Sequence, residues 1–248
     1  MRLQSFGFDF PYIKNEERIK LIIDENRCSK EEAIKIDYQV NWKEMRRKLT
    51  LQTRCITALF ERLFGCFDTR DCCKLLIEGV PVEPDSIIRN FSGVYTVQVV
   101  FDYDSFISMD ELNKKKSILE LLMYGIEKVA SVQKWSMEPF TNVYKKITEL
   151  GYKNEWVWFK SARSPSDEYT ASVIVNHSVD YADIYIQVND DNNVEVFKEK
   201  VISEQPDEFA YANRLGTIKW NSSREIVLAS KSGSEELSVR LTNIETKY

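Results

Sequence analysis

The sequence predicts an α+β fold in two parts: an α+β domain over residues 1–151, then a mostly antiparallel β-meander or β-sandwich domain over residues 152–248. Before Gly151, apolar residues recur mainly at the three- and four-residue spacing of helices. After it they form short β-branched and aromatic runs between Asn, Asp, Ser and Gly, as strands and turns do. The charge changes at the same place, because residues 1–150 hold 23 basic and 23 acidic side chains while residues 151–248 hold 11 and 16.

The first predicted domain opens with helical signals. Asn15 can cap a helix that runs to about residue 26. Ser29 and Glu32 form a capping-box pattern, in which the hydroxyl and the carboxylate each accept a hydrogen bond from a backbone amide of the first turn. The following stretch, 30–42, stays open between helix and strand, because its apolar residues alternate after this helical start.

Three further helices are expected in this domain. Residues 43–64 carry apolar side chains at helical spacing. Ser108 and Glu111 form a second capping-box pattern at the start of a helix over 108–133. A helix over 139–150 begins with proline, which suits a first helical turn.

Strands are expected at two places in the first domain and throughout the second. Residues 73–80 and 94–103 read as strands, and Tyr95, Val97 and Val99 share one face of the latter with Phe101. The strands predicted in the second domain are 156–160, 169–176, 184–189, 194–202, 216–220, 225–230 and 236–241.

Two polar turns in the second domain precede apolar strands in a similar way. They are Ser164-Pro165-Ser166-Asp167-Glu168-Tyr169-Thr170-Ala171 and Trp220-Asn221-Ser222-Ser223-Arg224-Glu225-Ile226-Val227-Leu228. The pattern resembles the turns of TolB-type and related β-propeller blades, over residues 164–228 only. The resemblance implies a blade-like β-meander and brings no active site with it.

Composition and the lack of a recognisable targeting signal in the sequence lead us to expect a cytoplasmic protein. No apolar run reaches the roughly 18 residues of a membrane span, so no membrane partner is expected. The first residues contain Asp9 inside an apolar stretch and no cleavage site of a secretory signal. The cysteines are odd in number and fit no metal spacing, which indicates reduced thiols; they are Cys28, Cys55, Cys66, Cys72 and Cys73.

Few residues suggest catalysis, and no motif suggests a cofactor. The single histidine, His177, has no nucleophile tied to it by a motif and is expected in a turn or on the surface. Asp102 and Asp104 end a predicted strand and resemble the D-x-D signature of metal-dependent glycosyltransferases, in which the acids hold a divalent ion. The competing interpretation is a solvated turn that stops the strand.

Nucleic acid is not expected as a partner. The basic runs 46–48 and 114–116 lie in predicted helices near acidic residues and are expected to be solvated helix faces. The isoelectric point of about 5.3 also lacks the positive footprint of a nucleic-acid-binding protein. Trp156 and Trp158 share one face of a strand, where they belong either to the core or to an exposed binding patch.

The leading functional hypothesis is a non-catalytic protein that binds another protein through its acidic second domain. One version is an immunity-type protein that neutralises a basic toxin by occlusion, by analogy with other small, acidic proteins of this kind. The candidate acidic residues are Asp180, Asp183, Asp190, Asp191, Glu204, Asp207 and Glu208. Two alternatives remain: a metal-dependent transferase using Asp102 and Asp104, and a structural scaffold module that docks through an exposed edge strand.

Overall fold

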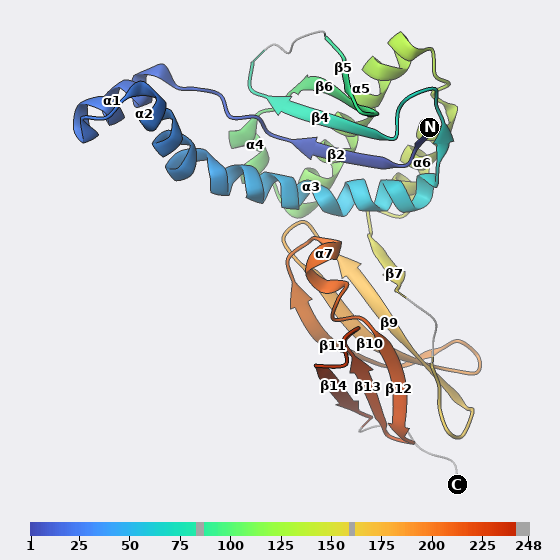
Figure 1. The fold of residues 1–248 in the computed structure, drawn as a ribbon. Coiled ribbons are helices and arrows are strands. Elements are labelled where there is room, and N and C mark those ends of the chain that lie inside the picture. Colours follow the sequence, from blue (N-terminus) through green and yellow to red (C-terminus); the bar gives the residue numbers. More distant parts are fainter. Residues whose placement is uncertain (83–86, 159–161, 242–248) are drawn as a thin grey trace. The chain divides into compact units, whose positions relative to one another are not determined.

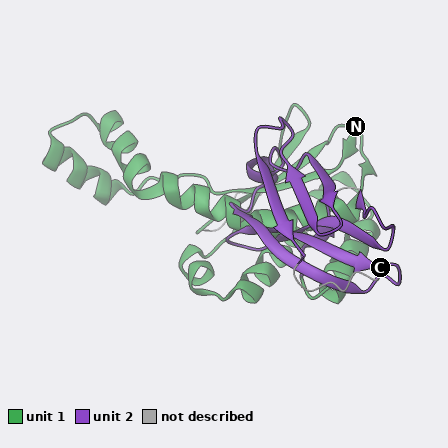
Figure 2. Ribbon diagram, turned by 90° about the horizontal axis from the view of Figure 1, so that it is seen from below, with its two compact units in different colours: residues 1–152 green, residues 153–248 purple. Residues whose placement is uncertain are grey.

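The computed structural model describes residues 1–82, 87–158 and 162–241 (Figure 1). The chain divides into two compact units, an N-terminal unit, Met1–Tyr152, and a C-terminal unit, Lys153–Tyr248 (Figure 2). The boundary predicted from the sequence lies one residue before this division. Helices and several sheets together make the fold α+β, as predicted.

The N-terminal unit is built on a four-stranded mixed sheet. Strands β2 (Ser5–Asp9), β4 (Lys74–Val80) and β6 (Val94–Val100) run parallel, and β5 (Arg89–Phe91) lies antiparallel to β6 at one edge. A separate short pair joins β1 (Arg2–Leu3) to β3 (Phe67–Asp68). Strand β6 ends at Val100, three residues before the end of the strand predicted over 94–103.

Helices α3 (Lys43–Phe64), α5 (Glu111–Gln133) and α6 (Glu138–Glu149) form a layer on this sheet (Figure 1). Helix α3 packs on β2, α5 packs on β4 and β6, and α6 packs on both helices. Alternate strand residues are buried, as the period of a strand requires. Among the buried strand residues are Phe6, Phe8, Leu75, Ile77, Tyr95, Val97 and Val99. Phe101 follows on the same face as the last three, which confirms the predicted face of the third parallel strand.

The start of α5 differs from the prediction. Ser108 is the last residue of a short helix, α4 (Tyr103–Ser108), and not a cap of α5. Asp110 caps α5 instead, because its carboxylate accepts a hydrogen bond from the backbone amide of Asn113 at 2.8 Å. The basic run 114–116 is also not uniformly solvated, since Lys114 is buried with its ammonium 5.5 Å from the centre of the Phe106 ring.

Two short helices, α1 (Glu16–Asn26) and α2 (Lys30–Asp37), form an arm that projects from this sheet (Figure 2). Both predicted caps are confirmed: Asn15 accepts from the amide of Arg18, and Ser29 and Glu32 make both bonds of the capping box. Stretch 30–42 is therefore helical, and it continues from α2 through a π-helical turn into α3. The arm's small core consists of Ile19, Ile22 and Ala33.

A buried carboxylate holds the base of the arm. The Asp37 side chain is fully buried and accepts hydrogen bonds from the Arg18 guanidinium, from the Tyr12 hydroxyl and from the Asn41 side-chain amide. Burial alone would raise the pKa of Asp37, but these hydrogen bonds and the charge of Arg18 lower it below its ordinary value. Asp37 therefore remains ionised and links the segment before α1 to the end of α2.

The C-terminal unit is a sandwich of two antiparallel sheets, as predicted. Its strands are β7 (Glu155–Val157), β8 (Ala162–Arg163), β9 (Tyr169–His177), β10 (Ala182–Asp190) and β11 (Glu195–Glu204) in one sheet, and β12 (Thr217–Ser222), β13 (Glu225–Ala229) and β14 (Glu236–Arg240) in the other. Buried residues of both sheets share one core, among them Val173, Ile184, Ile226 and Val239. The last two residues of the predicted 156–160 strand lie outside the described residues.

Two loops of this unit share one hydrogen-bond pattern. In the loop 164–169, the Ser164 amide donates to Tyr169 O at 2.8 Å and the Tyr169 amide donates to Ser164 Oγ at 3.1 Å. In the loop 230–235, the Ser230 amide donates to Glu235 O at 2.9 Å and the Glu235 amide donates to Ser230 Oγ at 3.2 Å. The loop 230–235 thus repeats the hydrogen-bond pattern of the loop 164–169. The two segments paired by the sequence, 164–171 and 220–228, also each place a turn before a strand, β9 and β13.

Among the helices of the described ranges, none combines the length and the apolar character needed to cross a membrane.

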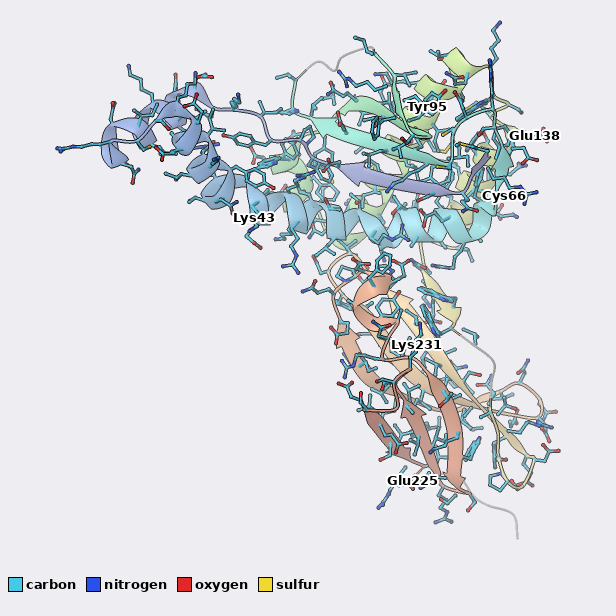
Figure 3. All side chains as sticks on the ribbon, viewed as in Figure 1. Lys43, Cys66, Tyr95, Glu138, Glu225 and Lys231 are labelled. Atoms are coloured by element: carbon cyan, nitrogen blue, oxygen red, sulfur yellow. The ribbon has the colours of Figure 1, made fainter. Side chains whose placement is uncertain are left out.

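The five cysteines are free thiols of unequal accessibility, which gives a testable expectation. Cys66, labelled in Figure 3, is exposed directly after α3, whereas Cys72 is buried. Burial raises the pKa of the Cys72 thiol to about 11, so only about one in a thousand of these thiols is ionised at pH 8. We expect iodoacetamide at pH 8 to modify Cys66 at least about a hundredfold faster than Cys72 in peptide maps. Equal rates in the native protein would contradict this expectation, and denaturant should make them equal.

Candidate functional site

One end of the C-terminal unit gathers most of the predicted acidic residues. Ala182 pairs with His177 across one side of β10 and with Glu204 across the other. The turn between β9 and β10 and the segment after β11 therefore lie at the same end of the sheet (Figure 1). This end, which we call the α7 end, carries Asp180, Tyr181, Glu204, Asp207, Glu208 and Phe209, with Asp183 one position inside.

A single helical turn, α7 (Glu208–Tyr211), shapes this end. Asp207 caps it, because its carboxylate accepts from the amide of Phe209 at 3.0 Å. Tyr211 is fully buried, and its ring centre lies 5.6 Å from that of Trp158 and 6.3 Å from that of His177. Residues two apart point to nearly opposite sides of a helix, so Phe209 faces solvent with 90% of its surface exposed.

The neighbouring turn adds a second aromatic side chain. The Ser178 amide donates to Tyr181 O at 2.8 Å and closes the turn between β9 and β10. Tyr181 is 43% exposed and Asp180 beside it is exposed. The α7 end thus presents exposed aromatic rings next to carboxylates.

Two of the acidic residues at this end have basic partners. Asp183 is buried and its carboxylate lies 3.3 Å from Lys200 Nζ. Glu204 forms an ion pair with Arg214. Of the other acidic residues at this end, Asp180 is exposed, and Asp207 and Glu208 are partly exposed.

Asp190 and Asp191 lie at the opposite end of the same sheet, in the turn between β10 and β11. Asp190 Oδ1 accepts from the amides of Asn192 at 2.9 Å and Val194 at 2.8 Å, which shapes the turn. Asp191 lies 2.9 Å from Arg163 Nη1. The structure therefore does not bring these two residues together with the α7 end.

The predicted tryptophan pair lies on the core side of the sandwich. Trp156 and Trp158 share a face, with ring centres 6.3 Å apart, and both are partly buried against the core. The Trp158 ring also packs edge-on against the buried ring of Tyr211, so it helps to hold α7 in place.

His177 is not a turn or surface residue, and that prediction was wrong. It is the last residue of β9 and is fully buried, with its ring 6.3 Å from Tyr211 and 6.5 Å from Trp156. The aromatic rings that bury it come from β7 and α7, which lie far from it in sequence.

Asp102 and Asp104 are both exposed at the start of α4. Asp102 accepts hydrogen bonds from the amide of Ser105 at 3.1 Å and from its hydroxyl at 2.6 Å. These bonds lower the pKa of Asp102, since they favour the ionised carboxylate. Throughout the described ranges, no group of three or more His, Cys, Asp or Glu side chains is placed to hold a metal ion.

The exposed aromatic residues Phe209 and Tyr181 were missed at the sequence level. Their neighbours Asp207, Glu208 and Asp180 drew attention only as charges. An aromatic residue directly after two acids and a proline is the signal that could have found Phe209. No protein-family model matches this chain, and neither the search of curated proteins nor the search of solved structures found a match.

Proposed function

We propose that this protein binds another protein through the α7 end of its C-terminal unit, with Phe209 as the anchor. The observation that carries the proposal is a 90% exposed phenylalanine on a turn fixed by a buried tyrosine. Leaving an aromatic side chain in water has no benefit for folding, whereas burying one in a partner's pocket gains affinity. Because the turn is already ordered, binding requires little additional ordering.

Charge supports a basic partner. Asp180 directly precedes Tyr181, and Asp207 and Glu208 directly precede Phe209. The unit that carries them accounts for the net charge of −5. Opposite charges at the rim of an interface speed association and disfavour acidic partners. The partner we propose therefore offers an apolar pocket with basic residues around it.

The most specific form of this proposal is an immunity-type role, in which the α7 end covers a functional surface of a basic toxin. Its support is the acidic character of the unit and the placement of the anchor among carboxylates. A captured partner would be expressed alone and together with this protein. Growth arrest by the partner, relieved by wild type and not by Phe209→Ala, is the expected result.

The partner is sought with matched baits. We expect wild-type protein and Phe91→Ala to retain the same protein from an extract of the native host, and Phe209→Ala to lose it. Phe91 is a suitable control because it is also an exposed phenylalanine, at 82%, but lies in the N-terminal unit. With the purified partner, Phe209→Ala should weaken binding by about 2 kcal/mol, or about thirtyfold, in calorimetry.

The charge contribution is tested separately. The double variant Asp180→Asn, Glu208→Gln should slow association and flatten its dependence on salt, since rim charges act mainly on the encounter rate. Asp207 is left unchanged because it caps α7.

Retention of the same partner by the Phe209→Ala bait would contradict the proposal that Phe209 anchors the interface.

A further inference from the structure

The segment between β11 and β12, which carries Phe209, connects the two sheets of the C-terminal unit (Figure 1). Strand β11 belongs to the five-stranded sheet and ends at Glu204, and β12 belongs to the three-stranded sheet and begins at Thr217. We call residues 205–216 the crossover segment, and α7 lies within it. Because a single helical turn is not stable by itself, contacts with the two sheets have to hold Phe209 in place.

Packing fixes the second half of the crossover segment. Leu215 is 1% exposed and belongs to the core of the sandwich. The amide of Lys231, labelled in Figure 3, donates to Asn213 O at 2.9 Å from the loop between β13 and β14. Gly216 lies so close to the same loop that a Cβ atom on it would stand 2.5 Å from the carbonyl carbon of Ser230. This half of the segment therefore has little freedom to move.

Arg214 joins this fixed half to the start of the crossover segment. Its Nη1 donates to Oε1 of Glu204, the residue directly before the segment. Its Nε lies 3.3 Å from Oε2 of Glu235, in the loop that leads into β14. One guanidinium thus contacts a carboxylate of the five-stranded sheet and a carboxylate next to the three-stranded sheet. The contact with Glu204 closes the stretch 205–213, and Phe209 lies at the middle of that stretch.

The environment of Arg214 favours this role. Its side chain is 34% exposed and that of Glu204 is 29% exposed, and partly buried ion pairs are screened less by salt than exposed ones. A planar guanidinium can also pair with two carboxylates in fixed directions, which an ammonium group does with less order. In addition, the Arg214 amide donates to Tyr211 O at 2.9 Å, so the backbone of the same residue closes the end of α7.

We propose that Arg214 is a positioning residue for the α7 end, which keeps the crossover segment in the conformation that presents Phe209. The inference rests on the proposed function, in which Phe209 enters the partner. A segment that is ordered before binding loses less conformational entropy when the complex forms. Without the guanidinium, binding has to order the stretch 205–213, and affinity falls although Phe209 is unchanged.

The first part of the test needs no partner. Hydrogen exchange of peptides covering 205–213 is compared in the full chain between wild type, Arg214→Met and Arg214→Lys. The amides of Phe209, Ala210 and Ala212 donate to acceptors of the α7 turn, so their exchange reports its order. We expect exchange about tenfold faster in Arg214→Met, and at most about threefold faster in Arg214→Lys, which keeps the charge. Unchanged exchange in Arg214→Met overturns the proposal.

Arg240→Met is the matched control. Arg240 also forms an ion pair in this unit, with its Nε 3.4 Å from Oε1 of Glu225. This pair lies at the start of β13 and the end of β14, away from the loop that joins the two strands. Arg240→Met should leave exchange of 205–213 within about twofold of wild type. Exchange as fast as in Arg214→Met would show general loosening of the unit and overturn the proposal.

The second part uses the captured partner and a double-mutant cycle. Arg214→Met should weaken binding about tenfold in calorimetry, and Arg214→Lys at most about threefold. In the Phe209→Ala background, Arg214→Met should weaken binding by no more than about twofold, because the ring that it positions is absent. Equal losses in both backgrounds would overturn the positioning role. If wild type retains no partner while exchange changes as expected, Arg214 still orders α7 and only the proposed function is refuted.

Discussion

Tyr211→Ala is expected to lower the free energy of unfolding of the C-terminal unit by about 4 kcal/mol, as other truncations of buried aromatic residues do. The Tyr211 side chain is fully buried, and its ring packs edge-on against Trp158 and His177. Alanine leaves a cavity between these rings and frees α7 from the sandwich. Denaturant titration, followed by hydrogen exchange of peptides from the sandwich, measures the loss and assigns it to this unit.

Phe209→Ala is the control, because it removes a ring from the same helical turn. Phe209 is 90% exposed, so its truncation should change stability by no more than about 0.5 kcal/mol. The two variants are expected to distinguish a residue that stabilises the fold from one that contacts the partner. Tyr211→Ala loses stability, and Phe209→Ala loses only partner binding. Similar stability losses in both variants would mean that α7 does not present Phe209 to solvent.

The second large effect is expected for Phe6→Ala in the N-terminal unit. The Phe6 side chain is 1% exposed, and its ring centre lies 4.9 Å from Phe60 and 5.2 Å from Phe64, both on α3. It also lies 6.4 Å from the ring of Phe140 on α6, so one side chain joins β2 to two helices. We expect a loss of about 4 kcal/mol, measured by denaturant titration and located by hydrogen exchange in α3 and β2.

Phe91→Ala provides the comparison for this prediction as well. Phe91 lies on β5 of the same sheet and is 82% exposed, so its truncation should leave stability within about 0.5 kcal/mol of wild type. A small loss for Phe6→Ala would show that the cluster of phenylalanines repacks around the missing ring.

Local signals in the sequence were sufficient to predict most helices and the change from helical to strand spacing of apolar residues along the chain. Asn15 and the Ser29–Glu32 box cap their helices because each cap needs only residues within one helical turn. The predicted cap Ser108 was wrong, because Asp110, within the same short stretch, is a competing cap two residues later. The capping box also decides the stretch after Ser29, where alternation of apolar residues was compatible with either structure.

The candidate site depended on contacts that a sequence pattern does not encode. Asp183 and Asp191 looked alike as acidic residues, but their partners Lys200 and Arg163 are brought to them by strand pairing. His177 looked like a turn residue because the rings that bury it come from distant segments.

The parallel pairing of β2 with β4 has a consequence for synthesis of the chain. Ser5 pairs with Lys74, 69 residues later, so β2 cannot join its sheet until those residues have been made. At about 5–20 residues per second this takes roughly 3–14 s, whereas the arm helices can form locally within microseconds. During that interval Phe6, Phe8 and Phe10 lack the core that later buries them. The nascent chain therefore offers chaperones an aromatic segment that the finished protein conceals.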